Sequence, residues 1–167
     1  MARRVFFIFD LDGDAGRAER IRGTGAVADA DTEGFFTRAE LDEAMGQGHE
    51  GLQRLIHAHL QNTSVTVVLI GAQTANLAWV KYAIDQSIEQ RHGLLGLYIG
   101  HMKDEKGRTP TQGLKPIVPA GVDFPAYSWD GDRDRLMSEI AAAGKRSSAS
   151  SARSRSLRSL FVRASSH

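Results

Sequence analysis

The sequence predicts an α/β fold in which a parallel sheet of the flavodoxin type carries helices on both faces. Residues 65–70 read VTVVLI, a β-branched apolar run typical of a central strand buried on both faces. In the segment that follows, apolar residues recur every three or four positions, as on one face of a helix: Leu77, Val80, Ile84 and Ile88. Two more apolar runs, 5–9 and 94–99, also alternate with helix patterns, and this alternation favours parallel strands.

Shorter patterns predict the remaining elements at the end of the chain. A brief last strand is expected at 125–129, followed by a helix at 133–143. Asp130 or Asp132 would cap that helix, because a carboxylate accepts hydrogen bonds from unpaired N–H groups at a helix start. The segment 101–121 holds three of the four prolines and is expected to be a long surface loop.

Three further helices are expected in the first half of the chain. The charged residues 14–22 favour a short helix, and apolar residues between 52 and 60 recur at helical spacing. Thr37 and Glu40 form a box of the S/T-x-x-E type, which predicts a helix that begins at Arg38. A short edge strand is expected just before it, at 35–37, after an irregular stretch at 23–34 that is rich in Gly, Ala and Asp.

The amino-acid composition is typical of a globular protein. The chain of 167 residues is 41% hydrophobic and 25% charged, which suits one globular domain. It contains no cysteine, so it has no disulfide and no thiolate metal site, as is common for a cytoplasmic protein. The N-terminal apolar run is interrupted by Asp10 and Asp12 and does not resemble a signal peptide, and no transmembrane segment or metal site is expected.

Charge divides the chain into an acidic domain at 1–144 and a basic, Ser/Arg-rich tail at 145–167. The tail has six basic residues and no acidic one, which leaves the domain with a net charge of −5. The composition favours a solvated tail over a nucleic-acid arm or a membrane contact. One alternative stays open, a short docking helix whose apolar stripe would be Leu157, Leu160 and Phe161.

The hexapeptide F-D-L-D-G-D at 9–14 resembles the opening motif of haloacid-dehalogenase-type phosphatases. In such an enzyme Asp10 would attack phosphorus and Asp12 would act as general acid and base beside Mg²⁺. The remaining motifs of such a phosphatase would be supplied by Thr74, Lys81 and an acidic cluster of Asp130, Asp132 and Asp134. The simpler alternative is that the aspartates cap the next helix.

Three segments together resemble the TIR-like domains of bacterial Thoeris anti-phage systems. They are T-S-V-T-V-V-L-I-G, W-V-K-Y-x-I-x-x-S-I and G-L-L-G-L-Y-I, and the resemblance covers residues 3–143. It implies an enzyme without a cofactor that consumes NAD⁺ as substrate and makes an ADP-ribose-derived, often cyclic, signal for a separate effector. It also implies a phage-derived trigger and a homo-oligomer on activation. The residues that it places around the nucleotide, or in the core beside it, are Phe9, Asp10, Asp12, Gly71, Trp79 and Tyr82.

The sequence departs from this family at the position of the catalytic acid. The family carries a glutamate four residues beyond the tryptophan, and here that position is Ala83. Asp85 and Glu89 lie about 200° and 240° around the helix from it, so neither replaces the acid. Cleavage of a glycosidic bond needs a carboxylate near the oxocarbenium-like ribose, and alanine supplies none.

Three explanations of Ala83 follow. They are replacement of a natural glutamate, a natural pseudoenzyme that acts as a scaffold or sensor, and an enzyme that uses another carboxylate. We expect position 83 to face the carboxyl edge of the sheet beside the packed side of its helix. A glutamate placed there would then cost little stability.

Overall fold

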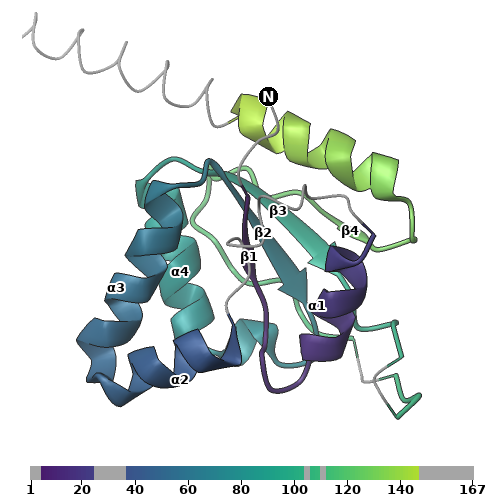
Figure 1. Cartoon of the computed structure of the whole chain (residues 1–167). Helices are drawn as coiled ribbons and strands as arrows, with labels where there is room; N and C mark the ends of the chain where they lie inside the picture. Colours follow the sequence, from purple (N-terminus) through teal and green to yellow (C-terminus); the bar gives the residue numbers. More distant parts are fainter. Residues whose placement is uncertain (1–4, 25–36, 104–105, 110–111, 147–167) are drawn as a thin grey trace, which may run out of the picture.

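The computed structural model describes residues 5–24, 37–103, 106–109 and 112–146, and Figure 1 shows a twisted sheet between two layers of helices. The sheet has four parallel strands in the order β1-β2-β3-β4. The strands are β1 (Val5–Ile8), β2 (Val65–Ile70), β3 (Gly93–Tyr98) and β4 (Ala126–Ser128). The predicted α/β fold, its four strands and its parallel sheet are therefore confirmed.

The second strand is interior, as its apolar run predicts. β2 pairs with β1 from Val65 opposite Val5, and with β3 up to Ile70 opposite Tyr98. All six residues of β2 are buried. A strand covered on both faces and paired on both edges has no surface for polar side chains except where they bond internally, and this is why the run reads as continuously apolar.

Helices cover both faces of the sheet, with α3 and α4 on one face and α1 and the C-terminal helix on the other (Figure 1). The helices are α1 (Ala15–Arg22), α2 (Arg38–Gly46), α3 (Gly48–Gln61), α4 (Ala78–Glu89) and the C-terminal helix at 133–146, with a 3₁₀ turn, η2 (Thr74–Asn76), before α4. In the described part of the chain no helix is long and apolar enough to cross a membrane.

Both predicted helix caps are present. The Thr37 side chain accepts a hydrogen bond from the Glu40 N–H at 3.0 Å and so starts α2. The Asp132 carboxylate accepts from the N–H groups of Asp134 and Arg135 at 3.0 and 3.1 Å. Each bond satisfies a donor that the first helical turn leaves unpaired.

The C-terminal helix continues beyond residue 143, where the sequence placed its end. Arg146 belongs to the helix and donates to the Leu94 carbonyl at 2.9 Å, and its Nε lies 3.2 Å from the Asp123 carboxylate. Two residues assigned to the tail, Lys145 and Arg146, therefore belong to this helix, and Arg146 contacts the domain. The tail from 147 onward, most of the stretch at 23–34 and the first two residues of the strand expected at 35–37 lie outside the described residues.

The hydroxyl of Tyr127 on β4 is buried and has no hydrogen-bond partner in the structure as described. Burial raises the pKa of Tyr127 from 10.0 to about 12, although Arg135 lies 4.1 Å from the ring centre and opposes the shift. We expect Tyr127→Phe to raise the free energy of unfolding by about 1 kcal/mol, since it removes a buried hydroxyl whose desolvation no hydrogen bond offsets. An ultraviolet titration should lose its highest phenol transition.

The sign of the pH dependence follows from the raised pKa. The unfolded chain releases the phenol proton first, so Tyr127 should lower stability as the pH rises above 10 and Tyr127→Phe should remove that contribution. A loss of more than 1.5 kcal/mol at neutral pH would show that the hydroxyl has a bond that the structure does not record.

Candidate functional site

The carboxyl edge of the sheet, formed by residues 9–14 after β1 and 71–77 after β2, is where ligands bind in open parallel sheets. The chain turns tightly there between β1 and α1. The Asp10 carboxylate accepts from the Asp12 N–H at 3.0 Å, and the Asp10 carbonyl accepts from the Asp14 N–H at 2.8 Å. Asp10 is thus largely buried and stabilises the turn that begins α1.

Asp12 lies at the outer side of this turn. Its side chain is 85% exposed and pairs with Arg38 at 2.7 Å. Arg38 also donates to the Leu11 carbonyl at 3.2 Å, so it joins the start of α2 to the β1–α1 turn. An exposed pair of this kind adds little stability, and its main consequence is to orient the Asp12 carboxylate.

Asp14 and Arg17 form a buried ion pair at the start of α1. Their charged atoms lie 2.7 Å apart, and the two side chains are only 3% and 4% exposed. Burial raises the pKa of the Asp14 carboxyl, while the hydrogen bond and charge of Arg17 oppose the rise. This pair was not predicted from the sequence, because a charged residue in a helix is far more often solvated than buried.

Arg17 connects α1 to the loop that follows β3. Its guanidinium donates to the carbonyls of Met102 at 2.8 Å and Gly13 at 2.9 Å, and approaches that of Arg108 at 3.5 Å. Two of these carbonyls belong to the loop after β3. The position of that loop over α1 is therefore fixed by one buried side chain whose charge Asp14 balances.

Gly71 follows β2 and lies directly against the Asp14 carboxylate. A Cβ at Gly71 would collide with that carboxylate, and a Cβ at Gly113 would collide with the Gly71 carbonyl. The start of α1, the turn after β2 and the segment around Gly113 are distant in sequence, and they meet at this point of the carboxyl edge. Close approach, rather than an unusual backbone angle, is what requires glycine here.

We expect Gly71→Ala to lower the free energy of unfolding by about 1–3 kcal/mol, because the new methyl group displaces a buried carboxylate. Urea unfolding would measure the change. The matched control is Gly46→Ala at the end of α2, where nothing lies within 4 Å of a new Cβ. The control should be neutral or slightly stabilising, and equal losses in both variants would contradict the close contact.

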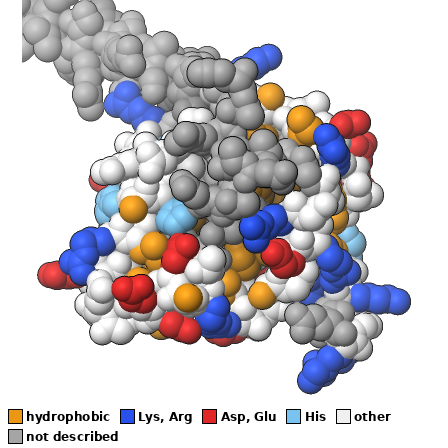
Figure 2. Space-filling model, viewed as in Figure 1, with side chains coloured by type: hydrophobic (Ala, Val, Ile, Leu, Met, Phe, Trp, Pro, Cys, Tyr) orange, Lys and Arg blue, Asp and Glu red, His pale blue; other side chains and the backbone are white. Residues whose placement is uncertain are grey.

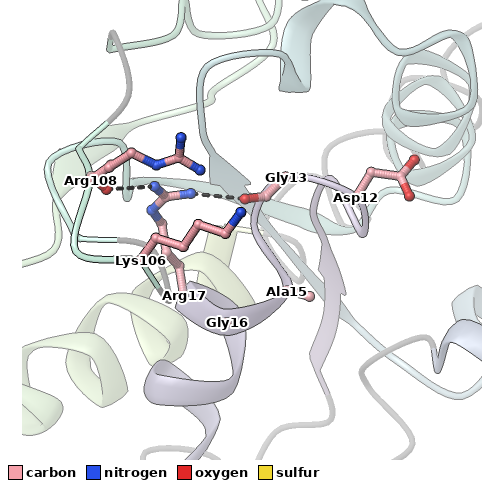
Figure 3. Close-up of a pocket in the computed structure, with 7 residues that line it drawn as sticks. All are labelled: Asp12, Gly13, Ala15, Gly16, Arg17, Lys106 and Arg108. Atoms are coloured by element: carbon pink, nitrogen blue, oxygen red, sulfur yellow. Dashed lines mark hydrogen bonds between the residues drawn. The ribbon is translucent and has the colours of Figure 1, made fainter.

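A pocket of about 190 Å³ opens where the loop after β3 lies over α1. It is lined by Asp12, Gly13, Ala15, Gly16, Arg17, Lys106 and Arg108 (Figure 3). Asp12 is the one sequence-predicted site residue among these seven. The figure shows the three cationic side chains gathered on one side of the turn, while the Asp12 carboxylate points away from them.

Phe9, Trp79 and Tyr82 are not among the residues that line this pocket. Phe9 is 4% exposed and belongs to the hydrophobic core. The Tyr82 hydroxyl bonds the His57 ring at 2.9 Å, which directs it toward α3. Trp79 is partly buried and packs against the core at the first turn of α4.

Ala83 is fully buried, which corrects the expectation that position 83 lies beside the packed face. It belongs to the packed face itself, with Val80, Ile84 and Ser87. Ser87, one helical turn after Ala83, helps to explain why position 83 is buried. The Ser87 hydroxyl donates to the Ala83 carbonyl at 2.8 Å and contacts the Thr66 hydroxyl of β2 at 2.9 Å, which turns this face of α4 onto the sheet.

Three of the residues that a phosphatase would need, Thr74, Asp130 and Asp132, make local structural contacts. The Thr74 hydroxyl accepts from the Gly71 N–H at 2.8 Å and so closes the turn after β2. Asp130 pairs with Arg135 at 2.7 Å, and Asp132 caps the C-terminal helix. Over the described ranges, no three His, Asp or Glu side chains could hold one metal ion together. The phosphatase alternative remains a prediction that a phosphomonoester assay would check.

Comparison with known proteins agrees with the fold and the motifs. The profile of the family described as "Thoeris protein ThsB, TIR-like domain" matches residues 6–104, more than half of the chain. A protein of Bacillus cereus (strain MSX-D12) named "Putative cyclic ADP-D-ribose synthase ThsB1" is 33% identical over 150 residues, which cover 84% of this chain and 78% of that protein. The chain therefore belongs to the TIR-like domain family of the Thoeris protein ThsB.

Proposed function

We propose that this chain binds NAD⁺ at the carboxyl edge of its sheet and that, with alanine at position 83, it holds the nucleotide without cleaving it. Membership of the family and the name of the Bacillus cereus relative support NAD⁺ chemistry. The proposal that the nucleotide is not cleaved rests on the position of Ala83, which lies four residues after Trp79 on the buried side of α4.

The direction of side chains on a helix explains how a buried position serves the carboxyl edge. The Cα–Cβ bonds of α4 tilt toward its N-terminus, which follows the turn at 74–76. A longer side chain at position 83 would therefore extend along Trp79 toward that edge. Alanine ends at its Cβ, so it leaves this path without a carboxylate.

The reaction that glutamate would support is cleavage of the bond between the ribose C1′ and the nicotinamide nitrogen. The bonding electrons leave with nicotinamide, which becomes neutral, and positive charge develops on the ribose. A carboxylate beside the ribose stabilises that charge. Attack at C1′ by water, with loss of a proton, gives ADP-ribose, and attack by a group of the same nucleotide gives a cyclic product.

Within this proposal the active form works in the cytoplasm. A phage-derived trigger and self-association would activate it, and its cyclic ADP-ribose-derived product would reach a separate effector by diffusion. A non-catalytic sensor or scaffold is the second candidate, and Ala83 itself favours it. The two candidates share nucleotide binding and differ in whether a glutamate at position 83 gives turnover.

Calorimetry with NAD⁺, followed by chromatography of the same sample, tests the proposal. We expect saturable binding and NAD⁺ recovered intact, because the pocket and the carboxyl edge are present and the acid is absent. Failure to bind NAD⁺ under any activating condition would contradict the proposed function. Rapid release of nicotinamide with Ala83 in place would contradict the assignment of position 83.

A further inference from the structure

Two large hydrophobic side chains of the segment between β3 and β4 are open to solvent. Ile117 is 93% exposed and Leu114 is 81% exposed. The other large hydrophobic side chains that are exposed in the described part of the chain, Met45 and Met137, lie on separate helices. On the face that Figure 2 shows, hydrophobic side chains are scattered among charged ones. Two such side chains within four residues therefore distinguish residues 114–117 from the rest of the described surface.

The backbone that carries these two side chains is held against the domain at several points. Gly113 lies so close to the Gly71 carbonyl that a Cβ would collide with it, and Pro116 is buried. The Lys115 ammonium donates to the Phe124 carbonyl at 2.7 Å and lies 5.0 Å from the centre of the Phe124 ring. An apolar surface on a fixed backbone can be covered at a small cost in conformational entropy, which favours a docking role.

The described part of the C-terminal helix ends near this segment. The Arg146 Nε lies 3.2 Å from the Asp123 carboxylate, and Asp123 is the neighbour in sequence of the residue that Lys115 contacts. Position 157 lies eleven residues beyond Arg146. At the usual rise per residue it could lie about 16 Å away along a helix, or about 36 Å away along an extended chain. The tail is therefore long enough to return to residues 114–117.

The sequence of the tail contains an apolar stripe that could cover this surface. Leu160 and Phe161 follow Leu157 by three and four residues, which is the spacing of one helix face. The tail beyond residue 146 has four arginines and no acidic residue, whereas residues 1–144 carry a net charge of −5, so charge also favours their contact. We propose that these three tail side chains dock on Leu114 and Ile117 of the same chain, with or without a bound nucleotide. The contact would remove apolar surface of both segments from water.

A spin label on the tail of the full chain tests this proposal by nuclear magnetic resonance. The chain has no cysteine, so Ser159→Cys provides a single attachment site. Position 159 lies about 200° around a helix from position 157, away from the apolar stripe. The amide signals of Val118 and Val122 should lose most of their intensity through paramagnetic broadening and recover it when the nitroxide is reduced. Full intensity of both signals in the labelled chain would overturn the proposal.

Two variants of the labelled chain make the test specific. Leu114→Ser/Ile117→Ser removes the exposed apolar side chains, and the broadening at Val118 and Val122 should then be lost. Met45→Ser removes an exposed side chain of α2 and should leave the broadening unchanged. Unchanged chemical shifts of β2 would verify that both variants are folded. Broadening that persists in the double variant would overturn the proposal.

A second copy of the chain is the alternative occupant of this surface. A mixture of isotope-labelled chain without the spin label and spin-labelled chain without the isotope reports only contacts between copies. We expect no broadening in this mixture. Broadening there as strong as within one chain would show that the tail docks on a second copy and would overturn the proposal. No nucleotide is added, so the proposed function stands or fails separately.

Discussion

The Ala83→Glu variant should release nicotinamide from NAD⁺ at least about 100-fold faster than the chain with Ala83. Loss of one preorganised electrostatic group commonly costs 10²–10³ in rate, roughly 3–4 kcal/mol, and the substitution supplies that group. The carboxylate would extend from a buried Cβ toward the first turn of α4, where Trp79 lies. Equal concentrations of the two proteins, with phage lysate or crowding agent added to promote assembly, would give the comparison.

The burial of Ala83 adds a stability effect that the sequence did not predict. A carboxyl group introduced at a fully buried position should lower the free energy of unfolding by about 1–3 kcal/mol. Burial raises the pKa of such a group, so the loss should grow as the pH rises above about 4.3. Bound NAD⁺ should recover part of it.

Ala83→Gln is the matched control for charge. It has nearly the same size and is also polar, but it lacks the carboxylate, so it should be destabilised and inactive. If the glutamine and glutamate variants released nicotinamide at the same rate, position 83 would not be the place of the missing acid. The scaffold candidate would then be favoured.

Asp14→Ala should lower the free energy of unfolding by about 3–5 kcal/mol, the usual cost of removing one partner from a buried ion pair. The Arg17 guanidinium would stay buried without its counter-charge, and the loop that it holds through Met102 would be released with it. Urea unfolding followed by circular dichroism would measure the loss. Asp14→Asn keeps an oxygen acceptor for Arg17 and should lose less.

The same helix provides a matched control for this experiment. Glu19 and Arg22 form an ion pair with the same three-residue spacing, but their side chains are 61% and 42% exposed. Glu19→Ala should change stability by no more than about 0.5 kcal/mol, because solvent screens the pair. Similar losses for Asp14→Ala and Glu19→Ala would show that the Asp14–Arg17 pair is not buried in solution.

Periodicity predicted most of the fold correctly, for a physical reason. Strands that are covered on both faces must be apolar throughout, so the runs that became β1, β2 and β3 were visible without any tertiary information. The caps at Thr37 and Asp132 were visible because they depend on residues within one helical turn.

The candidate site was less predictable because it depends on contacts between distant segments. Lys106 and Arg108 lie about ninety residues from α1, and only the fold brings them over it. Position 83 was assigned from its neighbours in sequence. These neighbours show which side of the helix is apolar, but they do not show the polar contacts that set the rotation of the helix about its axis. The contact between Ser87 of α4 and Thr66 of β2 contributes to that rotation, and it joins residues that are distant in sequence.

Hydrogen exchange of the chain with Ala83, measured with and without NAD⁺, tests the central claim most directly. The claim is that nucleotide binding at the carboxyl edge is retained while cleavage is lost. We predict slower exchange on NAD⁺ addition in residues 10–17 and 71–79, no change in α2 (Arg38–Gly46), and NAD⁺ recovered intact from the sample. Unchanged exchange at both segments with saturating NAD⁺, or protection confined to other regions, would contradict the account.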